Sequence, residues 1–290
     1  MAESYGLVGA GPGRLPAGHG AFPAQWERGN LQRLKESARV ASTIDNNLPL
    51  LEVREVTRSF GGLTAVSDFS LELCRGDLTG LIGPNGAGKT TCFNLITGSY
   101  RPSSGQIIAC GQRIDGLAPA AINRAGIART FQNIRLFQNL SVLDNVAVGA
   151  LFGKGEGTAD LKEAREKALR HLDFVGLGRF ADQRADELGG PGRKRLELAK
   201  ALAMEPKLLL CDEVMAGLNH VEIDEVIDVI RKVRDSGITI LVIEHVIKAI
   251  KSLSDRLLVI HHGEKIADGE PDAVLSDKTV VEAYLGKRRA

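Results

Sequence analysis

Apolar and polar residues follow strand-like and helix-like periods in alternation from Leu50 onward. The stretch Leu51–Val56 alternates between apolar and charged side chains, as in a strand with one buried face. Three short apolar runs bounded by chain-breaking residues predict further strands, and the last of them is nearly all β-branched residues and leucine, as in a strand buried on both faces. These runs are Leu78–Ile82, Lys207–Cys211 and Ile238–Ile243.

Two longer stretches carry apolar residues at helical spacing. The first, Ala159–Val175, is followed by Gly176 and presents an apolar face made of Leu161, Ala164, Ala168, Leu172 and Val175. The second repeats this spacing from Ile223 to Val233 and ends before Ser236 and Gly237. Strands that alternate with helices predict a parallel sheet, so we predict an α/β domain.

Residues 1–48 lack these periods. The segment Gly6–Pro23 is crowded with glycine and proline, a composition that buries little apolar surface, so we predict a disordered N-terminal extension. A short polar helix around Trp26, Leu31 and Leu34 is expected within Gln25–Ile44. A start codon placed too early and a docking tail are the alternative interpretations of this extension.

Composition excludes some classes of protein. The 290 residues are 43% hydrophobic and 25% charged with a net charge of +1, so bulk charge does not favour nucleic-acid binding. The four cysteines show no paired spacing, which predicts free thiols in a reducing cytosol. No apolar run approaches the roughly 18–20 residues of a membrane helix, and no secretion signal is visible. Action at a membrane would therefore require another, membrane-spanning subunit.

A glycine-rich motif follows the predicted strand Leu78–Ile82 and precedes the helical stretch Thr91–Ile96. Its backbone N–H groups and the helix N-terminus suit phosphate oxygens, while the lysine suits the β- and γ-phosphates and the threonine hydroxyl suits Mg²⁺. The sequence therefore predicts ATP and Mg²⁺ as cofactors; the alternative is an ordinary glycine turn. The predicted nucleotide-binding residues are Gly83, Pro84, Asn85, Gly86, Ala87, Gly88, Lys89, Thr90 and Thr91.

Two carboxylates end the predicted strand that begins at Lys207. Asp212 and Glu213 would lie at the carboxyl edge of the sheet, where α/β proteins bind ligands. Asp212 suits the Mg²⁺ shell, and Glu213 suits a general base that activates water. A pair of solvated acids at the end of a strand is the alternative.

With their surroundings, these motifs resemble the ATP-binding subunits of ABC transporters over about residues 50–286. The resemblance implies a P-loop NTPase (RecA-like) core with a mainly helical subdomain. It also implies that Gln132 senses Mg²⁺ and water, that His245 holds the γ-phosphate and that Phe60 stacks on adenine. For Phe60, an ordinary core aromatic is the alternative. Asn219 stands where many members have aspartate, in the loop that touches the partner ATPase.

Four finer motifs resemble the ATP-binding proteins of branched-chain amino acid importers. They are Phe60–Val66, Ala128–Asn133, Met215–Asn219 and the C-terminal ending Val281–Gly286. Nothing in the chemistry of these residues recognises an amino acid, so the solute is expected to be selected by other proteins.

One departure from the family pattern lies in its signature loop, which here consists of Leu188, Gly189, Gly190, Pro191 and Gly192. Gly189 stands where the family has a serine whose hydroxyl meets the partner's γ-phosphate, and Pro191 has no N–H to offer. One lost hydrogen bond to a charged group costs roughly 1.5–3 kcal/mol, which weakens a site without abolishing it. We therefore expect an asymmetric heterodimer, with a homodimer as the alternative. Val214, where the family often has proline, is a second and minor departure.

The resemblance also implies an organisation and partners. We expect an ABC ATP-binding domain at 49–290, with its core at 49–135 and 206–262, a helical subdomain at 136–205 and a C-terminal region at 263–290. Expected partners are transmembrane permease subunits, a second ABC ATPase subunit (a paralogue or a second copy of this chain) and, indirectly, an extracytoplasmic solute-binding protein. Permeases would be pulled through the region after Gln132, including Phe137–Ser141.

The expected location is therefore the cytoplasmic face of the plasma (inner) membrane, peripheral through the permeases, and no nucleic acid is expected as a partner. The expected function is an ATP-hydrolysing importer motor for branched-chain amino acids or related small polar solutes. Alternatives are the ATPase of a lipid or lipopolysaccharide exporter, a weakly hydrolysing regulatory subunit, and a soluble ABC ATPase that acts on nucleic acid or ribosomes.

Overall fold

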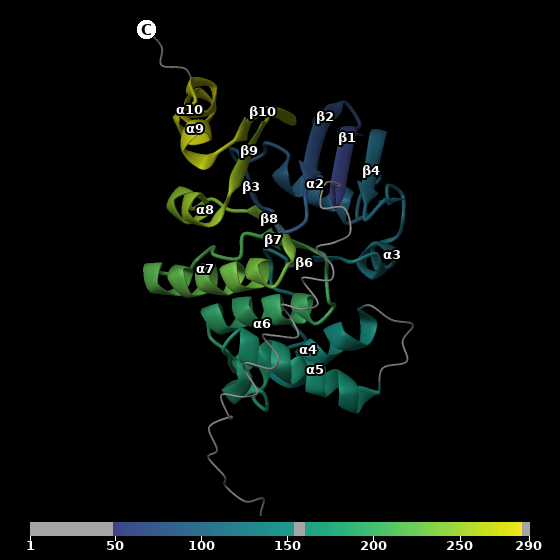
Figure 1. Ribbon diagram of the computed structural model, residues 1–290, viewed down its shortest axis with the longest axis vertical. Helices are drawn as coiled ribbons and strands as arrows, with labels where there is room; N and C mark the ends of the chain where they lie inside the picture. Colours follow the sequence, from purple (N-terminus) through teal and green to yellow (C-terminus); the bar gives the residue numbers. More distant parts are fainter. Residues whose placement is uncertain (1–48, 154–159, 286–290) are drawn as a thin grey trace, which may run out of the picture. The chain divides into compact units, whose positions relative to one another are not determined.

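The structure, a computed structural model, describes residues 49–153 and 160–285. The N-terminal extension and the short helix expected around Trp26 lie outside the described residues. The described part contains two sheets and a set of helices (Figure 1). No helix in these two ranges is long and apolar enough to cross a membrane.

The larger sheet has six strands in the order β10-β9-β3-β8-β7-β6. All neighbours in it pair in parallel except β9 and β10, which are antiparallel. The strands are β3 (Leu78–Ile82), β6 (Ile127–Arg129), β7 (Leu208–Asp212), β8 (Thr239–Ile243), β9 (Arg256–His261) and β10 (Glu264–Gly269). The three apolar runs became β3, β7 and β8, so the predicted α/β domain with a parallel sheet is confirmed.

Both faces of this sheet are buried, and its side chains alternate between two hydrophobic cores. Leu209 and Cys211 of β7 belong to one core, whereas Leu208 and Leu210 belong to the other. This double burial explains why these strands are continuous apolar runs in the sequence. Asp212 is the last residue of β7 and is buried like the rest of the strand.

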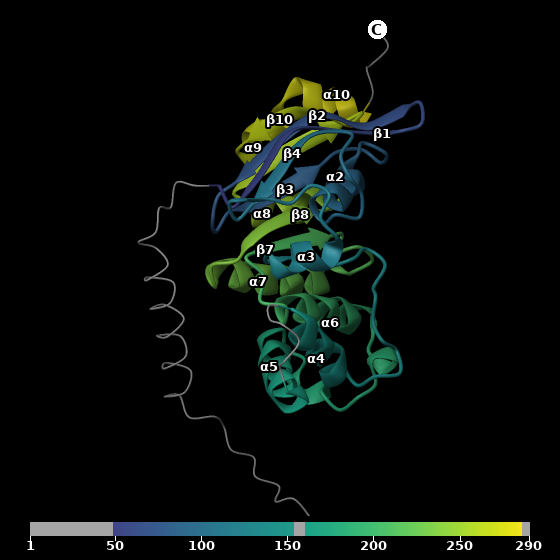
Figure 2. The same ribbon diagram turned by 90° about the vertical axis from the view of Figure 1, so that its right-hand side faces the viewer.

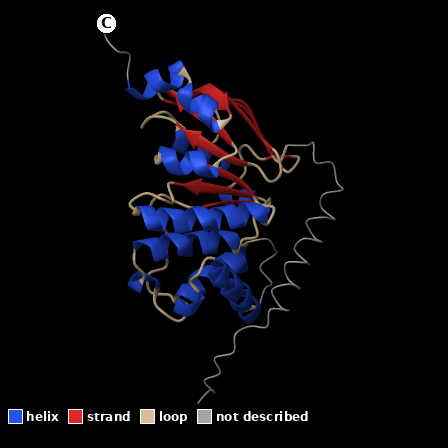
Figure 3. Cartoon of the chain, turned by 60° about the vertical axis from the view of Figure 1, so that its left-hand side comes forward, coloured by secondary structure: helices blue, strands red, loops and turns tan. Residues whose placement is uncertain are grey.

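A second, antiparallel sheet was not predicted. It has the order β2-β1-β4-β5 and consists of β1 (Leu51–Phe60), β2 (Leu63–Leu73), β4 (Ser104–Ala109) and β5 (Gln112–Arg113). The expected strand Leu51–Val56 continues to Phe60 across shifts of register, one of them beside Glu55, whose φ is +49°. The shifts between Val56 and Arg58 and between Arg58 and Ser59 interrupt the two-residue period, so the predicted strand ended at Val56. In Figures 2 and 3 this sheet lies on one side of the six-stranded sheet, and helices α4 (Val142–Phe152), α5 (Leu161–Phe174) and α6 (Gly190–Leu202) lie on the other side.

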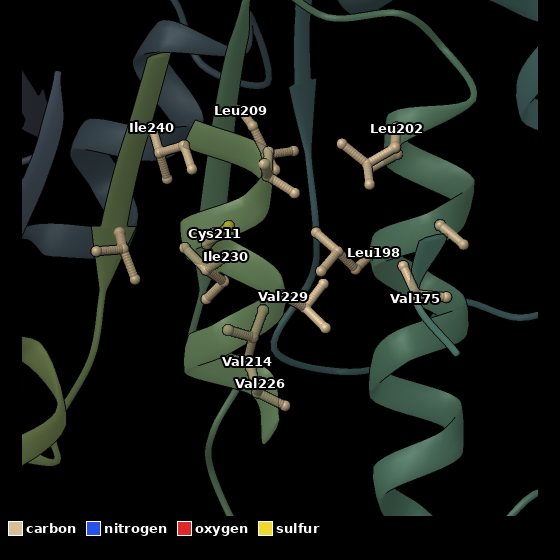
Figure 4. Close-up of a cluster of buried hydrophobic side chains, with 14 of the residues drawn as sticks. Val175, Leu198, Leu202, Leu209, Cys211, Val214, Val226, Val229, Ile230 and Ile240 are labelled. Atoms are coloured by element: carbon tan, nitrogen blue, oxygen red, sulfur yellow. The ribbon is translucent and has the colours of Figure 1, made fainter. Parts of the chain in front are cut away.

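The helices that flank the six-stranded sheet are α2 (Lys89–Ile96), α3 (Pro119–Arg124), α7 (His220–Asp235), α8 (Ile247–Leu253), α9 (Pro271–Ser276) and α10 (Lys278–Leu285). Helix α7 confirms the second helical prediction, because the expected face from Ile223 to Val233 is buried. Asn219 caps this helix and forms a capping box with Glu222. The side chains of α7 pack on those of β7, β8 and α6 (Figure 4).

Helices α4 (Val142–Phe152), α5 (Leu161–Phe174) and α6 (Gly190–Leu202) lie between β6 and β7 in the chain, with the 3₁₀ turns η1 (Gly178–Phe180) and η2 (Ala185–Glu187). Helix α5 confirms the first helical prediction, and Ala164, Ala168 and Leu172 are buried. Leu161 was expected on the same face but is 49% exposed, because it is the first residue of the helix. The domain boundaries given above stay a prediction.

Candidate functional site

The order of the strands brings the chemically distinctive residues together. Strands β3, β8, β7 and β6 are neighbours, and each leads at its carboxyl end into a segment with predicted site residues. An open pocket of about 570 Å³ lies there. Its lining is Ala65, Asn85, Gly86, Ala87, Gly88, Lys89, Thr90, Thr91, Gln132, Glu213 and His245. The sequence placed all of these residues at the site except Ala65.

The glycine-rich loop has the geometry that its sequence predicts. Gly88 precedes α2 with a φ of +111°, and a Cβ at this position would lie 2.6 Å from the backbone oxygen of Ala65. Only glycine fits, because the left-handed backbone and the close approach of β2 each exclude a side chain. The loop therefore keeps its backbone N–H groups at the helix N-terminus, where phosphate oxygens bind.

Lys89 is held in place by the same loop. Its Nζ donates hydrogen bonds to the oxygens of Gly83 at 2.6 Å and Pro84 at 2.9 Å. Burial lowers the pKa of Lys89, and the nearby carboxylates of Glu213 and Asp212 act in the opposite direction. The Lys89 ammonium thus lies beside the pocket. It is bonded to two neutral carbonyl oxygens, and phosphate oxygens can replace them.

Three predicted catalytic side chains meet around Glu213. Gln132 Nε2 donates to one oxygen of Glu213 at 2.5 Å, and His245 Nε2 donates to the other oxygen at 2.5 Å. The backbone of Glu213 has a φ of +50°, an uncommon conformation for a residue other than glycine. Its N–H donates to the oxygen of Ile243 at 2.9 Å, which fixes this turn to β8. Residues from three elements therefore orient one carboxylate toward the phosphate loop.

Asp212 is buried behind Glu213 and has one uncommitted oxygen. Its Oδ2 accepts a hydrogen bond from Arg129 at 2.5 Å, while Oδ1 is buried and has no hydrogen-bond partner within the described ranges. Mg²⁺ takes hard oxygen donors, and the chemistry of an Asp212 oxygen, the Thr90 hydroxyl and the Gln132 amide oxygen fits it; Thr90 and Gln132 line the pocket, whereas Asp212 is not among its lining residues. No group of three or more His, Cys, Asp or Glu side chains suits a metal in the part of the chain that the structure describes.

Phe60 does not line this pocket. It ends β1, is 38% exposed and packs edge-on against Tyr100, with ring centroids 5.1 Å apart. The guanidinium carbon of Arg58 lies 4.5 Å from the Phe60 ring centroid. The partly exposed ring is thus held at the surface by an aromatic and a cationic neighbour, and its contact with adenine stays a prediction.

The altered signature loop also lies outside the pocket. Gly189 precedes α6 with φ −64° and ψ 169°, and Pro191 lies in the first turn of the helix, as expected. A Cβ at Gly189 or Gly190 would meet no atom within 4 Å. The open surroundings of these glycines agree with a loop that serves a neighbouring molecule's site.

Three residues at the site received no role from the sequence. Lys194 Nζ, in the first half of α6, donates to the backbone oxygen of Glu213 at 3.1 Å. Buried Glu244 accepts the N–H of Met215 at 2.7 Å, and burial raises its pKa to about 7. Arg129 pairs with Asp212. For Arg129 and Glu244, the sequence offered one signal of a role at the site, because each is a charged residue at the end of an apolar strand.

Comparisons with known proteins identify relatives of the chain. The family model for the ABC transporter matches residues 66–216, and the model for the branched-chain amino acid ATP-binding cassette transporter matches residues 264–290. The chain is 39% identical to the high-affinity branched-chain amino acid transport ATP-binding protein BraF of Pseudomonas aeruginosa, over 82% of this chain and 98% of BraF.

Solved structures are similar as well. A crystal structure of a nucleotide-free ATP-binding cassette from an ABC transporter has a TM-score of 0.75 and 31% identity, over 83% of this chain and all of that chain. A dimeric structure of a bacterial ABC transporter cassette has a TM-score of 0.70 and 25% identity, over 76% of this chain and 98% of that chain.

Proposed function

The chain belongs to the ABC transporter ATP-binding family, and we propose that it is the ATP-hydrolysing motor of an importer for branched-chain amino acids. The observation that carries the enzymatic part is the Glu213 carboxylate, which Gln132 and His245 hold beside an intact phosphate loop. The solute is proposed from the similarity to BraF and from the matched C-terminal segment.

The chemistry of the site divides among its residues. Backbone N–H groups of the loop bind the phosphates, and Lys89 exchanges the carbonyls of Gly83 and Pro84 for phosphate oxygens. Glu213 accepts a proton from the attacking water, a contribution of about 10²–10⁴-fold in rate. His245 positions Glu213 and contacts the γ-phosphate. Thr90, Gln132 and Asp212 would hold Mg²⁺, which neutralises phosphate charge when bound.

The partners follow from the family and belong to the same proposal. Two cassettes close on ATP, so that the phosphate loop of each meets the signature loop of the other, and their closure moves transmembrane permeases. The exposed side chains of Phe137 and Leu140, after Gln132, are proposed to face these permeases. We propose that the chain acts at the cytoplasmic face of the plasma membrane, with solute delivered by an extracytoplasmic binding protein.

The signature loop supports an asymmetric pair of cassettes. Gly189 supplies no hydroxyl and Pro191 supplies no N–H to a partner's ATP, whereas this chain's own Lys89 and Glu213 line the pocket. We propose that this chain's ATP meets a complete signature loop from a paralogous ATPase, and that its own loop serves the weaker site.

The first experiment measures Mg²⁺-dependent ATP turnover by the purified chain beside its Glu213→Gln variant. Under the asymmetric proposal, the chain alone binds ATP with little turnover, and adding the paralogue raises turnover that Glu213→Gln then abolishes. Turnover by the chain alone that Glu213→Gln abolishes would support a homodimer instead. Turnover that Glu213→Gln leaves unchanged would remove Glu213 from the mechanism. Uptake of labelled leucine by reconstituted permeases tests the solute, and export of lipid would contradict it.

A further inference from the structure

Arg129 lies where three parts of the site meet. It is the last residue of β6, and its side chain is 7% exposed. One guanidinium nitrogen, Nη2, donates to Asp212 Oδ2 at 2.5 Å, and the other, Nη1, donates to Asn94 Oδ1 of α2 at 2.7 Å. Arg129 therefore joins the helix that follows the phosphate loop to the carboxylate expected to bind the metal.

Two aromatic rings fix the plane of this guanidinium. Its central carbon lies 5.3 Å from the ring centroid of Phe93 and 5.3 Å from that of Phe131. Arginine is suited to this arrangement, because its planar fork makes directed hydrogen bonds while its face contacts aromatic rings. A lysine ammonium is a single point charge, so it does not hold two acceptors in fixed directions as the planar guanidinium does. The position of Arg129 is thus set independently of Asp212.

The consequence for Asp212 is an unequal pair of oxygens. Oδ2 is occupied by Arg129, whereas Oδ1 is buried and has no hydrogen-bond partner in the described part of the chain. A carboxylate in this state offers one oxygen to a cation. Because Arg129 is held at both ends, Asp212 cannot rotate to offer both oxygens without breaking the ion pair.

We propose that Arg129 is a specificity-determining residue that restricts Asp212 to one-oxygen coordination and so makes the site prefer Mg²⁺ over Ca²⁺. Mg²⁺ requires near-octahedral geometry and takes single carboxylate oxygens, whereas Ca²⁺ takes six to eight oxygens and accepts two from one carboxylate. This inference rests on the proposed nucleotide-binding function.

The test uses the full chain and a fluorescent, non-hydrolysable ATP analogue. Its affinity is measured without metal, and then across titrations with Mg²⁺ and with Ca²⁺. The metal also binds the nucleotide in solution, but equally for every variant, so differences between variants report the protein. In Arg129→Gln, the ratio of Ca²⁺ to Mg²⁺ effectiveness is expected to rise about tenfold or more, because both oxygens of Asp212 become available.

Two further variants keep the result decisive. Removing one partner of a buried ion pair is destabilising, so Arg129→Gln is checked for folding by circular dichroism. Asn94→Ala places a good helix former in α2 and releases only the second anchor of Arg129, so a smaller rise in the same ratio is expected. Arg165→Gln breaks the exposed pair with Asp144 and is the matched control, with no change in the ratio.

The outcomes separate this inference from the proposed function. A raised ratio in Arg129→Gln or in Asn94→Ala, with Arg165→Gln unchanged, supports the inference. Folded variants that bind the analogue with the wild-type ratio overturn it and leave the proposed function intact. A wild-type chain that does not bind the analogue with either metal overturns the proposed function, and the inference with it.

Discussion

Replacing Gly189 by serine supplies the hydroxyl that the signature loop lacks. The backbone at Gly189 is extended, with φ −64° and ψ 169°, so any residue adopts it without strain. A Cβ there meets no atom within 4 Å, so the serine side chain requires no rearrangement. As the residue that precedes α6, serine can accept the N–H of Gly192 and still donate its hydroxyl hydrogen to a partner's phosphate.

The two effects of this serine differ in size. Serine and glycine differ by only a few tenths of a kcal/mol as helix caps, so the free energy of unfolding is expected to change little. One hydrogen bond to a charged phosphate contributes roughly 1.5–3 kcal/mol, which corresponds to about 10- to 150-fold in the ATP concentration needed for closure. The effect on dimerisation should therefore greatly exceed the effect on folding.

The assay measures ATP-dependent self-association of this chain in a Glu213→Gln background, where both ATP sites of the pair carry the variant and bound ATP is not hydrolysed. The ATP concentration at half-maximal dimer is compared for Gly189, Gly189→Ser and Gly189→Ala by analytical ultracentrifugation. Serine is expected to lower this concentration by about 10-fold or more, and alanine is not, because it adds the Cβ without the hydroxyl. Equal values for serine and alanine would refute the argument that the missing hydroxyl weakens this loop.

Two other predictions follow from the residues around Glu213. Lys194→Met removes the donor to the backbone oxygen of Glu213. Turnover by the complete ATPase pair should therefore fall about 10-fold or more, while ATP affinity stays near that of the wild type. A fall in ATP affinity with unchanged turnover would contradict this prediction. Burial raises the Glu244 pKa from 4.5 to about 7, so the stability that protonated Glu244 contributes should be full below pH 4.5 and be lost as pH rises to about 7. Glu244→Gln keeps an acceptor for Met215 and cannot titrate, so its free energy of unfolding relative to wild type should rise by about 3 kcal/mol between pH 4.5 and 8. Denaturant titrations at several pH values measure this, and parallel profiles would contradict it.

Much of the fold was predictable because its signals are local. The strands β3, β7 and β8 are buried on both faces, so each is a continuous apolar run bounded by chain-breaking residues. Of the antiparallel sheet, only the first part of β1 was predicted. Register shifts between Val56 and Arg58 and between Arg58 and Ser59 interrupt the two-residue period in the rest of that strand.

The phosphate loop was determined by the sequence itself, because a short run of residues between a strand and a helix carries its whole geometry. The contacts around the two acids depend on the order of the strands instead. Arg129 and Asp212 are 83 positions apart in the chain, and Gln132 and Glu213 are 81 apart. No local pattern records which oxygen of Asp212 is occupied. Only the tertiary structure decided this, because β6 pairs directly with β7 and brings their carboxyl ends together.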